Sequence, residues 1–290
     1  MTWIDEGEPR RAVVTGDGVS LSTTATGAGR PHVLWLHGGP GMFDYLAPAA
    51  RAVSFGTHVR FDQRGCGRSD PVGPFTLERY LHDIEDVRRS YELDRPVVAG
   101  HSFGATLALL YALSHPSTVA GVLYVSGTGI GRTWRQAHHA AHDRRLTVGQ
   151  RQRRDELRSR SAEWSWDEEV EYRRLSYLPD VADVDRATVL VEPLATAPWR
   201  INLECNAALG AEGKRDLDGG QLAHRCAALR VPVLMVHGAD DPHPLWATDS
   251  LVAALPDVRR TVVAGSGHLP FVEQPAEFAT AVERFLEALA

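Results

Sequence analysis

The segment VVAGHSFGATLALLYALSHP, residues 97–116, decides the fold class of this 290-residue chain. A short apolar run rich in valine leads directly into the glycine-flanked turn GHSFG, residues 100–104. Good helix formers follow this turn as far as Pro116, which lies where a helix should already have ended. The segment therefore predicts a strand, a sharp turn that carries Ser102, and a helix.

The same succession of strand, turn and helix recurs on both sides of this segment. VLWL runs into HGGPG, HVRFD into QRGCGRS and GVLYVS into GTGIG, and VPVLMVHG and RRTVVAG add two strands near the end of the chain. Such alternation predicts an α/β protein with a mostly parallel central sheet flanked by helices. Residues 11–21 and 33–36 are β-type segments separated by glycine-bearing turns, which predicts an antiparallel opening.

The pattern changes between residues 130 and 225. Strand signals fade there, and stretches rich in arginine and tryptophan appear, such as RQRRDELRSRSAEWSWDEEVEYRRLSYL. We therefore expect a helical cap over 130–225, inserted into a discontinuous core of residues 1–129 and 226–290.

Composition narrows the classes of partner. The chain is 43% hydrophobic and 23% charged, as in ordinary globular proteins, and its net charge of −6 gives no general attraction to nucleic acid or to an anionic membrane. No apolar run approaches the roughly 20 residues that cross a bilayer, so a cytoplasmic location is expected. Three cysteines without a CxxC pair predict neither a disulfide framework nor a zinc site. We expect no metal and no cofactor, and the sequence leaves the oligomeric state open.

Ser102 is the candidate nucleophile, because the GxSxG turn between a strand and a helix exposes a serine hydroxyl at the end of the strand. A serine hydroxyl needs a base to remove its proton and a carboxylate to orient that base, in the chain order serine, acid, histidine. Asp241 and His268 each follow a predicted strand in that order. Asp240 is the alternative acid, which spacing alone does not exclude.

Two backbone amides are candidates for the oxyanion hole, the pair of donors that stabilises the negative oxygen of a tetrahedral intermediate. One is the N–H of Phe103, directly after the nucleophile. The other is Gly39 in the loop HGGPG, residues 37–41, because glycine lets a backbone N–H approach a substrate closely. Gly38 is the alternative in that loop.

Four motifs together resemble the proline iminopeptidases of the α/β-hydrolase superfamily: HGGPG, DQRGCGRSD, GHSFGATLALLYALSHP and the terminal GSGHLPFVEQP. The resemblance implies the α/β-hydrolase fold and removal of an N-terminal proline from short peptides without a metal. It also implies that Asp62 and Arg64 brace a loop beside the site. Carboxylates in the cap would then hold the free ammonium of the substrate.

Glu204 is the candidate ammonium anchor that this resemblance implies. The aminopeptidase members carry a glutamate in an Arg-Ile-Glu segment of the cap, whereas this chain has Arg200-Ile201-Asn202 and the glutamate two places later. A salt-bridged cap residue is the alternative role for Glu204. Trp164 and Trp199 are candidate walls of an apolar substrate pocket, with packing within the cap as the alternative.

Two further functions stay open. The turn GHSFG replaces the GGSWG common among the aminopeptidases, which favours an esterase or amidase for small acyl substrates as the alternative activity. A non-hydrolytic ligand-binding protein of the same fold is the third, since a fold alone does not determine function.

Overall fold

One eight-stranded sheet forms the centre of the protein, and the computed structural model describes residues 7–216 and 220–289 of the chain. The spatial order of the strands is β1-β2-β4-β3-β5-β6-β7-β8. The strands are β1 (Arg10–Val14), β2 (Ser20–Ala28), β3 (His32–Leu36), β4 (Gly56–Phe61), β5 (Val97–His101), β6 (Gly121–Val125), β7 (Val233–Gly238) and β8 (Val258–Val263).

Strands β1, β2 and β4 pair antiparallel, and every other pairing in the sheet is parallel. The antiparallel opening and the mostly parallel sheet predicted from the sequence are therefore confirmed. Parallel strands must be joined by crossovers, which explains why helical segments separate β3 from β4 and each later strand from the next.

Helices cover both faces of this sheet. The α-helices of the described chain are α1 (Ala47–Ala52), α2 (Leu77–Ser90), α3 (Phe103–Ser114), α4 (Arg135–Arg144), α5 (Val148–Ser159), α6 (Trp166–Tyr177), α7 (Val184–Ala195), α8 (Leu203–Asp216), α9 (Gly220–Ala228), α10 (Asp249–Ala254), α11 (Pro270–Glu273) and α12 (Pro275–Glu287). The structure contains no described helix that is both long and apolar enough to cross a membrane.

Alternating side chains of the central strands feed two hydrophobic cores. In β3, Leu34 and Leu36 join the core beneath α2, α3, α9 and α10, whereas Val33 and Trp35 join the core beneath α1, α11 and α12. All four side chains are at most 2% exposed. Burial on both faces accounts for the continuous apolar runs that predicted these strands.

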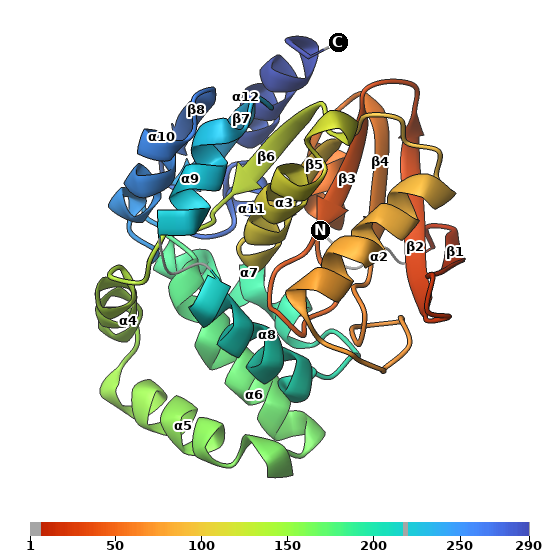
Figure 1. Ribbon diagram of the computed structural model, residues 1–290. Coiled ribbons are helices and arrows are strands. Elements are labelled where there is room, and N and C mark those ends of the chain that lie inside the picture. The colour runs from red at the N-terminus through yellow and green to blue at the C-terminus, as the bar shows by residue number, and fades with distance from the viewer. Residues whose placement is uncertain (1–6, 217–219, 290) are drawn as a thin grey trace.

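The described residues between β6 and β7 form helices and no strand. Helices α4 to α8 gather at one end of the sheet, shown in green to cyan in Figure 1. The next helix, α9, spans the expected boundary at residue 225. Its Leu222 and Cys226 both pack into a core shared with the sheet, so α9 belongs structurally with the core.

Glycines force the sharp turn at the end of β5. A Cβ at Gly100 would lie 2.0 Å from the carbonyl oxygen of Gly104, and a Cβ at Gly104 would lie 2.0 Å from that of Leu36. Between them, Ser102 has φ 57° and ψ −119°, a conformation that residues with side chains rarely adopt. The strand and helix can approach this closely only because both flanking positions are glycine.

Candidate active site

Ser102 lies between β5 and the first residue of α3, and it lines two cavities. The N-terminus of α3 contributes unpaired amide groups and the positive end of the helix dipole. A strained turn that holds a hydroxyl at the junction of cavities is typical of a nucleophile position.

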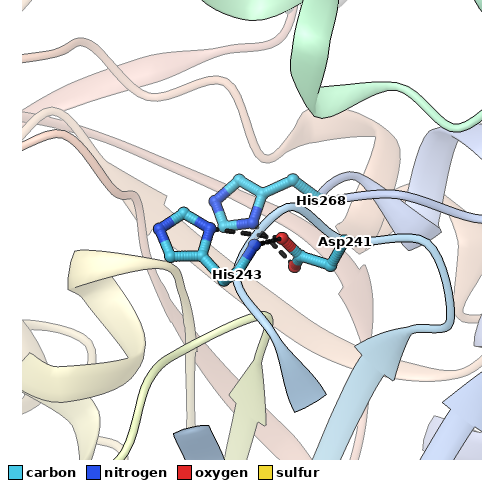
Figure 2. A group of neighbouring side chains, drawn as sticks. All are labelled: Asp241, His243 and His268. Atoms are coloured by element: carbon cyan, nitrogen blue, oxygen red, sulfur yellow. Dashed lines mark hydrogen bonds and ion pairs between the residues drawn. The ribbon is translucent and has the colours of Figure 1, made fainter. Parts of the chain in front are cut away.

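Asp241 and His268 form a buried hydrogen-bonded pair beside this serine. His268 Nδ1 lies 2.9 Å from Asp241 Oδ2, and His268 lines one of the two cavities that Ser102 lines. Figure 2 shows both imidazoles, those of His268 and His243, directed at the Asp241 carboxylate. Asp240, the alternative acid, is exposed, and its backbone carbonyl accepts a bond from Arg145. The geometry thus supports Asp241 over Asp240.

The pKa values at this pair shift in opposite directions. Burial by itself would lower the pKa of His268, but the charge of Asp241 and the hydrogen bond to it outweigh burial and raise that pKa above 6.5. Burial also opposes ionisation of Asp241, yet His268 and His243 hold the pKa of this carboxyl well below its usual value. Asp241 is therefore ionised and stabilises a protonated His268, which is what an orienting acid does for a general base.

The loop that carries His268 is held from two sides. The Glu273 carboxylate accepts the backbone N–H groups of Gly267 at 2.9 Å and Leu269 at 3.2 Å. The His268 N–H itself donates to the carbonyl oxygen of Asp180, in the insertion, at 2.7 Å. These bonds fix the loop that carries the imidazole. Glu273 was not predicted from the sequence, because its contacts depend on the turn geometry.

Neighbouring histidines pack around the pair but differ from it electrostatically. The ring of His243 stacks on that of His268 at 4.6 Å, and the ring of His101 lies 4.7 Å from it. Burial lowers the pKa of His243, and it lowers the pKa of His101 to about 3. Both rings stay neutral near pH 7, which supports His268 as the base.

The backbone donors predicted for an oxyanion hole flank Ser102. Gly39 lines both cavities and Phe103 lines one of them. The N–H of Gly38 donates to the hydroxyl of Tyr45 at 2.9 Å, whereas the N–H of Gly39 has no hydrogen-bond partner among the described residues. An occupied donor cannot serve an oxyanion, so the structure favours Gly39 over Gly38.

The two cavities that Ser102 lines have different linings. We call the first the histidine cavity: it has a volume of about 240 Å³, and its polar lining includes His138, His142, His268 and Asp180. We call the second the arginine cavity: it measures about 210 Å³, and its polar lining includes Ser126, Arg132 and Arg135. Gly39, Ser102 and His243 line both. The candidate nucleophile thus lies between two cavities: the described lining of one includes the carboxylate of Asp180, and that of the other includes arginines but no acidic residue.

Glu204 does not reach the site. It is exposed in the first turn of α8 and lines neither cavity. Asn202 accepts the N–H of Cys205 at 3.0 Å and donates to the carbonyl of Gly65 at 2.9 Å. Because Asn202 caps the helix, a residue two places later lies about 200° around its axis and faces solvent.

The two predicted pocket tryptophans are packing residues. Trp164 belongs to a small cluster with Leu157 and Leu175, and its indole N–H donates to the Leu157 carbonyl at 2.8 Å. Trp199 packs against Phe43, with the Arg68 guanidinium 3.8 Å above its ring. Neither is among the described residues that line the two cavities.

Several residues that do line the cavities were not singled out from the sequence. They are Asp180, Arg132, Trp134, Ser126 and the pair His138 and His142. His142 Nε2 lies 2.8 Å from Asp180 Oδ1, and the His138 ring stacks on that of His243 at 3.9 Å. The spacing of His138 and His142, one helical turn apart, was the signal available for this pair.

Ligand atoms of Asp241, His243 and His268 lie within 4.8 Å of one another, as a metal site would require. Their hydrogen bonds already account for this approach: His268 Nδ1 approaches Oδ2 of the carboxylate, while the His243 N–H, at 2.8 Å, and Nδ1, at 3.2 Å, approach Oδ1. The geometry is that of a carboxylate orienting two imidazoles.

Comparisons with known proteins agree with this fold. The alpha/beta hydrolase family matches residues 33–281. The proline iminopeptidase of Lactobacillus delbrueckii subsp. lactis is 26% identical over 262 residues, 86% of this chain and 87% of that protein. That of Saccharolobus solfataricus is 39% identical, but the alignment spans only 33% of each protein.

Solved structures show the same architecture. The proline iminopeptidase of Mycobacterium smegmatis superimposes with a TM-score of 0.70 at 22% identity, covering 97% of this chain and 98% of that one. A thermophilic esterase from Thermogutta terrifontis gives 0.72 at 20% identity, covering 97% and 99%. The sequence-based resemblance to proline iminopeptidases is confirmed by the relatives that carry this name, and the chain belongs to the alpha/beta hydrolase family.

Proposed function

We propose that this protein is a serine hydrolase that works through an acyl-enzyme on Ser102. The observation that carries the proposal is the buried Asp241–His268 pair, in which the carboxylate raises the pKa of the imidazole, placed on the wall of a cavity that the strained Ser102 also lines. A nucleophile, a base and an orienting acid are the groups that acyl transfer requires.

In this mechanism His268 Nε2 takes the proton of the Ser102 hydroxyl as its oxygen attacks the substrate carbonyl. The amides of Gly39 and Phe103 stabilise the negative oxygen of the tetrahedral intermediate. His268 then gives the proton to the leaving amine or alcohol. A water molecule, deprotonated by His268, attacks the acyl-enzyme and frees the acid and Ser102.

Release of an N-terminal proline from short peptides is the substrate class that we propose first. The names of the relatives support it, and so does one carboxylate of the insertion. Asp180 lines the histidine cavity, and although burial opposes its ionisation, the hydrogen bond to His142 lowers its pKa. An ionised carboxylate beside the nucleophile suits the ammonium of a prolyl substrate, in the role first assigned to Glu204.

Hydrolysis of a small acyl ester or amide is the second candidate. The solvent position of Glu204 favours it, since the glutamate displaced from the family position does not supply an anchor at the site. The arginine cavity also favours this class. Its described lining includes Arg132 and Arg135, which would repel a substrate whose only charge is positive.

The test compares prolyl 4-nitroanilide, N-acetylprolyl 4-nitroanilide and 4-nitrophenyl butyrate, with wild type and Ser102→Ala. A fluorophosphonate probe should label wild type but not the variant, and hydrolysis should disappear in the variant. Preference for the free prolyl amine supports the aminopeptidase, and cleavage of the ester alone supports the esterase. Absence of both labelling and hydrolysis would point to the non-hydrolytic binding protein and refute the proposal.

A further inference from the structure

We propose that the arginine cavity binds a carboxylate of the substrate through the guanidinium of Arg132 and the hydroxyl of Ser126. This inference rests on the proposed hydrolase function, because it places the carboxylate in a chamber that Ser102 and Phe103 also line. It names a charged group that the substrate would carry in addition to the bond that is cleaved.

Arg132 lies in a segment with a fixed backbone. Two residues before it, the N–H of Ile130 donates to the Ser250 hydroxyl at 2.8 Å. Just before it, the carbonyl of Gly131 accepts the indole N–H of Trp134 at 3.1 Å. These bonds fix the backbone that carries Arg132 at the cavity wall, which favours a preorganised binding group.

The side chain of Arg132 lacks a partner among the described residues. It forms no hydrogen bond or ion pair with any described residue, and its Nε is buried without a partner. Other arginines of the insertion are engaged: Arg153 pairs with Glu171 at 2.8 Å and Arg174 pairs with Glu192. A half-buried guanidinium without an acceptor leaves donors free for a ligand.

Ser126 gives a second, independent indication of a ligand in the same cavity. Its side chain is 1% exposed, and its Oγ has no hydrogen-bond partner among the described residues. Ser126 directly follows β6, the neighbour of the strand that leads to Ser102, and its backbone N–H donates to the carbonyl of Val236. A buried hydroxyl without a partner is costly unless a ligand or water completes it.

The charge of the lining selects the sign of the ligand. None of the described residues that line the arginine cavity is acidic, while Arg132 and Arg135 are cationic. The only acidic residue that lines the histidine cavity in the described part of the chain is Asp180. A carboxylate is therefore favoured in the arginine cavity, whereas the histidine cavity offers the carboxylate of Asp180. Planar guanidinium groups bind planar carboxylates through two parallel bonds, so carboxylate is the anion that fits.

The carboxylate can belong to either half of the substrate, and matched substrate pairs separate these sources. The first pair is the 4-nitrophenyl ester of monomethyl glutarate and that of glutarate itself, which adds the charge to the acyl half. The second pair is the prolyl anilide of 4-aminobenzoate methyl ester and that of 4-aminobenzoate, which adds it to the leaving group. Each pair is measured as the ratio of kcat/KM, acid over ester.

Wild type should prefer the acid in at least one pair by about tenfold or more, the scale of one charge-assisted hydrogen bond. Arg132→Gln should remove this preference, Arg132→Lys should retain part of it, and Ser126→Ala should weaken it. Arg144→Gln is the matched control, because Arg144 is exposed on the neighbouring helix α4 and lines neither cavity. Because the readout is a ratio within one enzyme, a loss of folded protein does not mimic the effect.

If wild type cleaves the neutral substrates, those that carry the methyl ester, and shows no preference for the acid in either pair, the carboxylate proposal is overturned and the hydrolase proposal stands. If no substrate is cleaved and the fluorophosphonate does not label Ser102, the hydrolase proposal fails. Calorimetric titration with glutarate and with 4-aminobenzoate then judges the cavity alone. The carboxylate proposal is supported if wild type binds one of these acids and the affinity falls at least about tenfold in Arg132→Gln but not in Arg144→Gln. Equal binding by the three proteins, or no binding, overturns it.

Discussion

Replacement of Asp241 by asparagine should remove almost all activity while leaving the shape of the site unchanged. In the structure the carboxylate has two separate tasks. Its Oδ2 accepts from His268 Nδ1 at 2.9 Å, and its Oδ1 accepts the backbone N–H of His243 at 2.8 Å. An asparagine has one oxygen and one NH₂ group, so it can perform only one of these tasks.

The His243 N–H decides the orientation of the new amide. If the amide oxygen faces that N–H, the NH₂ group faces His268 Nδ1 and selects the tautomer with a proton on Nε2, which cannot accept the serine proton. The reverse orientation sets two donors against each other, at a cost of about 1–3 kcal/mol for an unsatisfied buried donor. The productive form is thus disfavoured about 5- to 150-fold before the lost charge is counted.

Loss of the negative charge beside the protonated imidazole adds to this effect, and we expect a total fall in kcat of about 10⁴, as for the equivalent change in other triads. The assay is the turnover of 4-nitrophenyl butyrate, or of whichever substrate wild type cleaves best. Asp240→Asn is the matched control, since that residue is exposed and adjacent. A loss below about tenfold in Asp241→Asn, or a comparable loss in Asp240→Asn, would refute the assignment of the acid.

Three other predictions follow from the geometry. Because His268 acts as a base only when neutral and Asp241 raises its pKa, kcat/KM should rise with pH through a limb above 6.5; an NMR titration should find the imidazole pKa lower in Asp241→Asn, and an unchanged value would contradict this account. Gly104→Ala should lower the free energy of unfolding in urea by about 1–3 kcal/mol or more through its clash with backbone, whereas Gly149→Ala, which meets no atom within 4 Å, should be neutral or slightly stabilising. Glu204→Gln should leave the preference between free and N-acetylated prolyl anilide unchanged, and a large drop would restore its role as anchor.

The core was predictable because its signals are local. Twenty residues contain all three signals: the apolar residues before Gly100, the turn around Ser102 and the helix-forming residues after it. The structure places β5 and α3 at those positions. Asp241 and His268 were predicted by a similar rule, and in the structure each follows a strand. Parallel strands end at one edge of a sheet, so local positions imply a meeting in space.

The insertion was less predictable, because the direction in which each of its side chains points depends on the residue at which each helix begins. Glu204 lies two residues after Asn202, and the cap that Asn202 forms at the start of α8 turns it to solvent. Asp180 is the last residue of the short helical turn Leu178–Asp180 that follows α6, and it lines the histidine cavity. Its backbone carbonyl also accepts the N–H of His268. No periodicity in the sequence indicates which of these carboxylates faces the nucleophile.

The residues proposed for catalysis and those proposed for substrate selection come from different parts of the chain. The proposed nucleophile, acid and base all lie at the ends of core strands, whereas Arg132 and Asp180, a cation in one cavity and a carboxylate in the other, both come from the insertion between β6 and β7. Substitutions in the insertion should then alter which substrate is accepted more than the rate of the chemical step. Relatives that share the core can differ in substrate for the same reason, so the identity of the substrate must be sought in the residues that line these two chambers.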